Sequence, residues 1–255
     1  MSEVHHRGAH PEDARTFAPA RIPTLRRAVT EVSWLLGRGY PIALAVRAAG
    51  DRHQLELRAR LAVTRGAAAP EDVRARAARR VEPEALRGRT LHVDAFNLLI
   101  TLELALGGGV LIGCVDGPLR DLAGLRGSYH PVAETDGAIA LLGAALARWS
   151  PAACVLWFDA PVSNSGRLRA RVAELAATWE VALRCEMVPD ADAAMRGREL
   201  VASADAMVID GAAAWCNLGR AIVDAWVPGA WRVALDGDSE RCGDGLEHEP
   251  EEREG

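Results

Sequence analysis

The segment TLHVDAFNLLIT, residues 90–101, places an aspartate directly after a short apolar run and an asparagine three residues later. The run TLHVDAF is typical of a buried strand, whereas NLLITLELAL has its apolar residues at the spacing of a helix. A strand followed by a helix is the repeating unit of an α/β sheet. The segment therefore predicts the first strand and helix of a parallel sheet, with Asp94 at the carboxyl end of the strand.

The same pattern returns later in the chain. ACVLWFDAPVSNSG, residues 153–166, is again an apolar run, an aspartate and a loop. Further strands are expected at 110–117 and 181–188, and residues 201–213 are expected to be a strand or to pass from strand to helix. Helices are expected at 132–148, 165–179, 190–200 and 213–227, and an ordered loop or short helix at 118–130. The predicted fold class is α/β, a three-layer parallel sheet preceded by a small, mainly helical domain.

Four segments of different composition divide the chain. Residues 1–21 are polar and are expected to be flexible, and residues 22–86 read as a small helical domain. Residues 88–235 hold the alternating strands and helices of the α/β domain. Residues 236–255 are acidic, which is typical of a disordered tail.

Charge and composition restrict the function. Residues 1–90 contain 17 arginines and 10 acidic residues, a net charge of +7, and residues 91–255 carry a net charge of −12. This asymmetry indicates either two modules with different tasks or simply solvated helix surfaces. The chain contains no lysine, which excludes Walker-type ATPases and Schiff-base enzymes. Five cysteines without a CxxC pair argue against a zinc ribbon, and no apolar run reaches membrane-spanning length. We therefore expect a cytoplasmic protein without a membrane partner.

Several carboxylates occur where predicted strands end. Asp94 and Asp159 each close an apolar run, while Asp190 and Asp205 lie at junctions between elements. Ligands of parallel α/β sheets bind beyond the carboxyl ends of the strands. Four acids at one edge would repel one another unless a cation bound among them, and Mg²⁺ or Mn²⁺ prefers such oxygen ligands. The sequence therefore predicts a metal site at this edge.

Each of these acids also has a simpler interpretation. Asp94 can cap the helix that follows it, and Asp159 can open a turn before Ala-Pro. Asp190, with Asp192, can supply negative charge to a helix N-terminus, and Asp205 can be a loop acid.

Three motifs resemble those of a known group. VDAFN, residues 93–97, resembles the first-strand motif of PIN-like nucleases, especially of their NYN branch, where an aspartate and a nearby asparagine begin the active site. PDADAAM, residues 189–195, and VASADAMVID, residues 201–210, are similar to the later acidic motifs of that branch.

This resemblance implies roles for specific residues. Asp94, Asp190 and Asp205 would be catalytic acids that hold the metal, and Asn97 would orient a ligand or a water molecule. The residue before the last aspartate is Ala204, where the NYN pattern usually has a residue such as glycine. Asn97 is alternatively the cap of the helix that it begins.

The whole chain also resembles an uncharacterised prokaryotic family that joins a short N-terminal domain of unknown function to a PIN-like part. The resemblance covers about residues 25–226. It is carried by SWLLGRGY and GDRHQLELRAR in residues 33–60, and by DGPLRDLAGLRGSY and DAPVSNSGR in residues 116–167.

Two further polar clusters are candidates for substrate binding. Arg120 and Arg126 could hold phosphates as planar forks, or could pair within their own loop. Glu134, which opens a predicted helix, could be a further metal ligand or a favourable N-terminal charge. In SNSGR, free amides and an arginine could receive an anion, although helix capping explains the same residues. The candidates in this last cluster are Ser163, Asn164, Ser165 and Arg167.

These patterns favour a nuclease that uses Mg²⁺ or Mn²⁺ to hydrolyse phosphodiesters, with RNA as its expected partner and its basic N-terminal domain contacting phosphates. One alternative is a PIN-like module that binds RNA or protein without cleaving. Another is a small-molecule phosphohydrolase. A homo-oligomer is left open.

Overall fold

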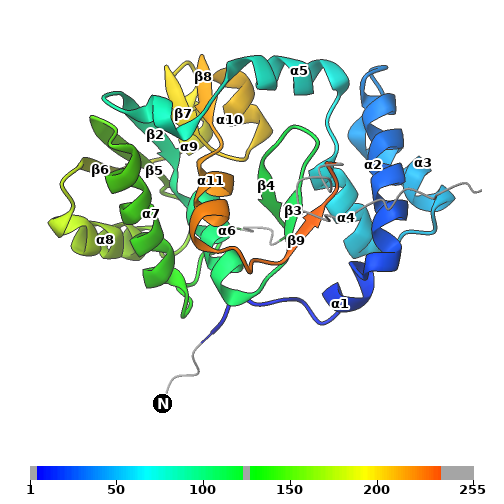
Figure 1. The fold of residues 1–255 in the computed structure, drawn as a ribbon, viewed down its shortest axis with the longest axis horizontal. Helices are drawn as coiled ribbons and strands as arrows, with labels where there is room; N and C mark the ends of the chain where they lie inside the picture. Colours follow the sequence, from blue (N-terminus) through cyan, green and yellow to red (C-terminus); the bar gives the residue numbers. More distant parts are fainter. Residues whose placement is uncertain (1–4, 123–126, 237–255) are drawn as a thin grey trace, which may run out of the picture.

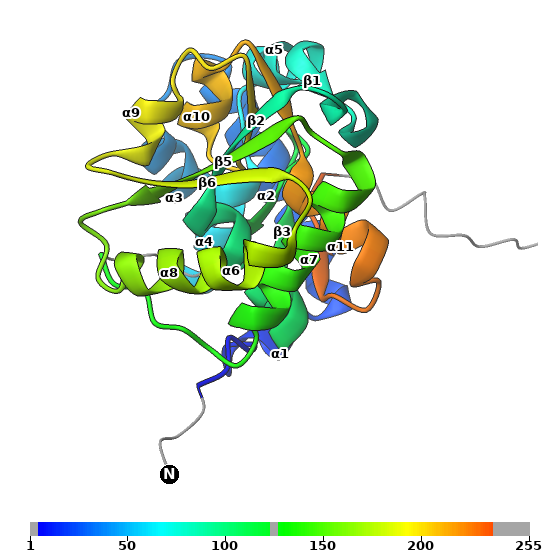
Figure 2. The same cartoon turned by 90° about the vertical axis from the view of Figure 1, so that its left-hand side faces the viewer.

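A computed structural model of the protein describes residues 5–122 and 127–236. Six of its strands form one sheet in the order β1-β8-β7-β2-β5-β6, and each neighbouring pair runs parallel (Figures 1 and 2). The predicted parallel α/β sheet is therefore confirmed. Its strands are β1 (Arg80–Val81), β2 (Thr90–Asp94), β5 (Ala153–Asp159), β6 (Ala182–Val188), β7 (Leu200–Ala202) and β8 (Ala214–Cys216).

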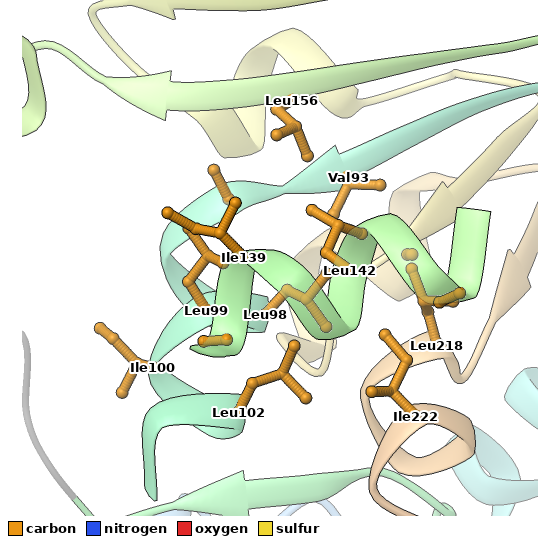
Figure 3. Close-up of a cluster of buried hydrophobic side chains, with 14 of the residues drawn as sticks. Val93, Leu98, Leu99, Ile100, Leu102, Ile139, Leu142, Leu156, Leu218 and Ile222 are labelled. Atoms are coloured by element: carbon orange, nitrogen blue, oxygen red, sulfur yellow. The ribbon is translucent and has the colours of Figure 1, made fainter. Parts of the chain in front are cut away.

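Helices cover both faces of this sheet because the strand side chains alternate between two apolar clusters. Leu91 and Val93 of β2 belong to the larger cluster, in which Val93 and Leu156 pack with helix side chains such as Leu98, Ile139 and Leu218 (Figure 3). On the other face, Val201 and Trp215 pack with two short helices. The first face is covered by α6 (Ala95–Gly107), α7 (Thr135–Trp149), α8 (Ser165–Leu175) and α11 (Leu218–Trp226), and the second by α9 (Ala191–Met195) and α10 (Ala206–Gly211).

The N-terminal region is mostly helical, as predicted. Its main helices are α2 (Ile22–Leu36), α3 (Ile42–Arg52), α4 (Leu57–Gly66) and α5 (Pro70–Arg79). The remaining short elements are α1 (Asp13–Thr16), η1 (Pro19–Arg21), η2 (Pro83–Leu86) and, later in the chain, η3 (Ala176–Thr178). No helix in the described ranges is both long enough and apolar enough to cross a membrane.

A second sheet joins this helical region to the rest of the molecule. Its strands are β3 (Leu111–Gly113), β4 (Leu119–Asp121) and β9 (Arg232–Ala234), in the order β4-β3-β9. Leu25, Val29 and Val32 of α2 share one buried cluster with Ile112 and Val233 of this sheet. The N-terminal helices therefore complete their core with strands from the middle and end of the chain, beside the main sheet (Figure 1).

Three sequence predictions need correction. Residues 118–130, expected as loop or short helix, contain β4, and the segment 213–227, expected as one helix, begins with β8. Both strands have three residues, which is too short for periodicity to separate a strand from the start of a helix. The strand predicted at 110–117 exists as β3, but it lies in the second sheet.

Parts of the two terminal segments can be compared with their predictions. Residues 5–21 contain α1 and η1. Near the start of this segment, the amide of Arg7 donates to Glu134, which directly precedes α7. Of the expected acidic tail, only Asp236 is among the described residues.

One buried arginine fastens the helical region to the α/β part. The guanidinium of Arg76 on α5 donates to Asp116 at 2.6 Å and to both carboxylate oxygens of Asp210 on α10, at 2.7 and 2.8 Å. The side chains of Arg76 and Asp116 are 5% and 0% exposed, so water cannot replace the lost partner if either is removed.

We predict that Arg76→Met lowers the free energy of unfolding by about 3 kcal/mol, because it leaves a buried carboxylate with an incomplete set of donors. The matched control is Arg74→Met on the same helix, since Arg74 is exposed. Urea unfolding followed by circular dichroism measures both. Equal stability of the two variants would contradict the assigned contact.

Candidate active site

The aspartate at the end of β2 is held by two neighbouring segments. Asp94 is the N-cap of α6, where its Oδ1 accepts from the amide of Asn97 at 3.1 Å. Its Oδ2 accepts from the hydroxyl of Ser203, just after β7, at 3.0 Å. The residue is 7% exposed, so burial and hydrogen bonds fix the carboxylate in one orientation.

Two more hydrogen bonds fix the loop between β7 and α10 against this junction. The side-chain Oδ1 of Asn97 accepts from the amide of Ala204 at 2.8 Å. The hydroxyl of Ser203 accepts from the amide of Asp205 at 3.0 Å, while Asp205 itself caps α10 through the amide of Met207. The N-cap of α6 is therefore Asp94 and not Asn97. The side chain of Asn97 instead holds the loop that carries Asp205 through its hydrogen bond with Ala204.

The end of β5 is joined to the start of α9. Asp159 closes β5, and its Oδ1 accepts from the amide of Ala191 at 2.7 Å. Asp192 lies in the first turn of that helix. The hydrogen bond therefore brings two further carboxylates to the same edge of the sheet, as parallel strands would require.

A cavity of about 710 Å³ lies at this edge, between the sheet and the N-terminal helices. Six aspartates and Asn97 are among the residues that line it. Asp94, Asp159, Asp192 and Asp205 lie at the edge of the main sheet and the starts of the helices that follow it, whereas Asp72 comes from α5 and Asp121 from β4.

The carboxylates disturb one another electrostatically. Burial, opposed by the hydrogen bond from Asn97 and reinforced by the charges of Asp192 and Asp159, raises the pKa of Asp94 to about 7. Burial and then the charges of Asp205, Asp159 and Asp190 raise the pKa of Asp192 to about 6. Such raised pKa values at a cavity are typical of functional sites, since a bound cation would lower them again.

The donor set suits Mg²⁺ or Mn²⁺. Among the described residues no three His, Cys, Asp or Glu side chains are close enough to form a complete metal cage. Mg²⁺ usually binds one or two carboxylates and keeps several water molecules, so a cage is not required. Carboxylate oxygens in a cavity with room for water therefore fit such an ion.

Several predicted site residues lie away from the carboxylate cluster. Asp190 is exposed and is not among the residues that line the cavity, because its Oδ1 caps α9 through the amide of Ala193. Glu134 accepts from His6 and from the amide of Arg7 at the opposite end of α6.

The predicted anion-binding segment before α8 lies beside the cavity rather than in its lining. The side-chain amide of Asn164 donates to the carbonyl of Tyr129, and the buried Ser165 faces the carbonyl of Ala160. Ser163 bonds through its backbone to the segment around Gly127, and Arg167 is exposed.

Arg120 lines the cavity, but its nitrogens donate to protein groups. Nη1 and Nη2 donate to the two oxygens of Asp116 at 2.8 and 2.6 Å, Nη1 also donates to the carbonyl of Arg65, and Nε donates to that of Ala204. Arg120 thus positions backbone on both sides of the cavity. Arg126 lies outside the described residues.

Sequence reasoning overlooked two site residues. Asp192 was interpreted only as negative charge at a helix N-terminus. Its position two residues after Asp190 indicated a second acid at the start of the same helix. Ser203 has no signal in the sequence, since its contact with Asp94 joins residues 109 positions apart.

Comparison with known proteins places the chain in a family. A family model described as a domain of unknown function (DUF5616) matches residues 83–221, more than half of the chain. The chain belongs to this DUF5616 family. A second model, described as a protein of unknown function (DUF434), matches residues 24–79.

The same pairing is supported by a relative. An uncharacterized protein of Methanocaldococcus jannaschii is 26% identical over 186 residues, which cover 73% of this chain and 89% of the relative. No solved structure matches the chain. The matches confirm an uncharacterised family of two domains. The DUF5616 region contains Asp94, Asp159, Asp192 and Asp205, whereas the DUF434 region contributes helices that line the same cavity.

We predict that Asp94→Asn stabilises the metal-free protein increasingly as the pH rises. The folded state holds the Asp94 proton more tightly than the unfolded state, so ionisation between about pH 4 and pH 7 favours unfolding. The free energy of unfolding of the isosteric variant should exceed that of the wild type by an amount that grows across this range to at most about 4 kcal/mol and then levels off. Urea unfolding in chelator from pH 4 to pH 8 measures it.

The control is Asp190→Asn, which removes an exposed carboxylate but keeps a good N-cap residue. It should follow the pH dependence of the wild type. A gain for Asp94→Asn that does not change with pH would contradict the raised pKa of Asp94.

Proposed function

We propose that this protein is a metal-dependent nuclease with a PIN-like α/β domain, and that it hydrolyses phosphodiester bonds in RNA. The observation that carries the proposal is the convergence of Asp94, Asp159, Asp192 and Asp205 at one cavity beyond the carboxyl ends of parallel strands. The resemblance of VDAFN and the later acidic segments to NYN-type motifs supports the same activity.

Mg²⁺ or Mn²⁺ would bind one or two carboxylates of this group and keep water as its remaining ligands. When bound, such an ion lowers the pKa of water and offsets negative charge on a phosphodiester. The raised pKa values of Asp94 and Asp192 support this assignment, since burial and the neighbouring carboxylates disfavour the ionised forms and a bound cation would offset both effects.

The protein's own groups fix the geometry. Ser203 contacts both Asp94 and the amide of Asp205, so it sets the position of one carboxylate relative to the segment carrying the other. Asn97 fastens the same segment through Ala204. Catalytic rates depend steeply on such positioning, because a misplacement of about 1 Å can cost a hundredfold.

Other features support RNA as the substrate and the cytoplasm as the location. Residues 1–90, which include the helical region, carry a net charge of +7 that suits a polyanion. Cys114, Cys154, Cys185 and Cys216 are free thiols, which fits a reducing compartment. A homo-oligomer remains compatible with the proposal.

The proposal predicts Mn²⁺-dependent cleavage of a labelled single-stranded RNA by the wild type. Asp94→Asn and Asp192→Asn should each lower kcat/KM at least a hundredfold, since each removes a charge from the cluster. Asp190→Asn should stay within about threefold of wild type, because it leaves the cavity lining and the α9 cap intact. Gel analysis of initial rates measures all four proteins.

The outcomes separate the functional classes. RNA binding without cleavage under any divalent metal would contradict the nuclease and favour a binding module. Turnover of nucleotides without cleavage of RNA would favour a phosphohydrolase. If Asp190→Asn lowered kcat/KM more than Asp192→Asn does, Asp190 and not Asp192 would be the catalytic acid.

A further inference from the structure

The wall of the cavity opposite the aspartates comes from the N-terminal helices. The end of α4 and the linker to α5 contribute Arg65 and Ala67–Ala69, and α5 contributes Glu71, Asp72 and Arg76. These residues belong to the DUF434 region, whereas Asp94, Asp159, Asp192 and Asp205 belong to the DUF5616 region. Residues of both regions therefore line the cavity.

Of the three arginines that line this cavity in the described part of the chain, one is available to a ligand. Arg76 is occupied by Asp116 and Asp210, and Arg120 by Asp116 and two backbone carbonyls. The guanidinium of Arg65, in contrast, is solvent-exposed and makes no hydrogen bond or ion pair with any described residue. An arginine beside several carboxylates that pairs with none of them remains free to bind an anion.

Arg65 is held close to the segment that carries Asp205. The Nη1 of Arg120 donates to the carbonyl of Arg65 at 3.0 Å, and the Nε of the same guanidinium donates to the carbonyl of Ala204 at 2.7 Å. One buried side chain therefore ties the backbone of Arg65 to the residue directly before Asp205. The free cation and the carboxylates face one cavity across this short connection.

The helix N-terminus on the same wall is a poorer site for an anion. Helix α5 begins at Pro70, and its first turn already contains Glu71 and Asp72. These carboxylates oppose the partial positive charge of the helix end. An anion on this wall would therefore bind at Arg65.

We propose that Arg65 binds a phosphate of a single-stranded nucleic acid and so positions the strand across the aspartates, an inference that rests on the proposed nuclease function. Arginine presents a planar fork that matches phosphate oxygens. A cavity of about 710 Å³ has the size of a small-ligand pocket, which is large enough for a nucleotide or two of a single strand.

The test compares Arg65→Gln with Arg74→Gln. Arg74 is a matched control because it is an exposed arginine of the same region that does not line the cavity. Both are made in full-length Asp94→Asn protein, and binding of a fluorescein-labelled single-stranded RNA in Mg²⁺ is followed by anisotropy over a range of salt concentrations. Arg65→Gln should weaken binding roughly tenfold. It should also reduce the slope of log K against log salt by about 0.7, the value for one phosphate contact.

Arg65→Lys should restore the salt slope because it restores the charge, and thermal melting should be unchanged because Arg65 is exposed. Equal binding by Arg65→Gln and Arg74→Gln would overturn the assignment, as would absence of RNA binding by the parent protein. The nuclease function is judged separately, from RNA cleavage by the otherwise wild-type chain. Cleavage with no effect of Arg65→Gln rejects only the phosphate contact, and a binding effect without cleavage rejects only the nuclease.

Discussion

The buried carboxylate of Asp116 lies between two arginines, and the arrangement of the cavity depends on this contact. Arg76 reaches it from α5, and Arg120 reaches it from β4. Arg76 also holds Asp210 at the end of α10, while Arg120 holds the carbonyl of Ala204 before the same helix. The helical region and the segment that carries Asp205 are therefore fixed to one another through a single desolvated carboxylate.

The contacts of Asp116 with Arg76 and Arg120 hold in place a cluster of carboxylates whose ionisation is unfavourable by itself. The pKa of Asp94 is raised to about 7 because burial and neighbouring charges oppose its ionisation. The hydrogen bonds from Ser203 and Asn97 compensate only in part. Proteins retain such unfavourable groups at functional sites, where a ligand supplies the missing charge. The structure thus combines a rigid surrounding with a site that a cation would stabilise.

The sequence predicted the parallel sheet and the positions of Asp94 and Asp159, because both follow strands whose apolar runs are distinct. It could not decide between Asp190 and Asp192, since the choice depends on where α9 begins and which carboxylate its amides engage. Ser203 and Arg76 act through contacts with residues more than 100 positions away, which local patterns do not encode. The three-residue strands of the second sheet were too short to show a period.

The central claim is that the four aspartates form a divalent-cation site, and calorimetric titration of the protein with Mn²⁺ at pH 8 tests it most directly. The account predicts saturable binding by the wild type that is weakened at least tenfold in Asp94→Asn and Asp192→Asn. Asp190→Asn should bind as the wild type does. Absence of Mn²⁺ binding by the wild type, or equal affinity in all four proteins, would contradict it.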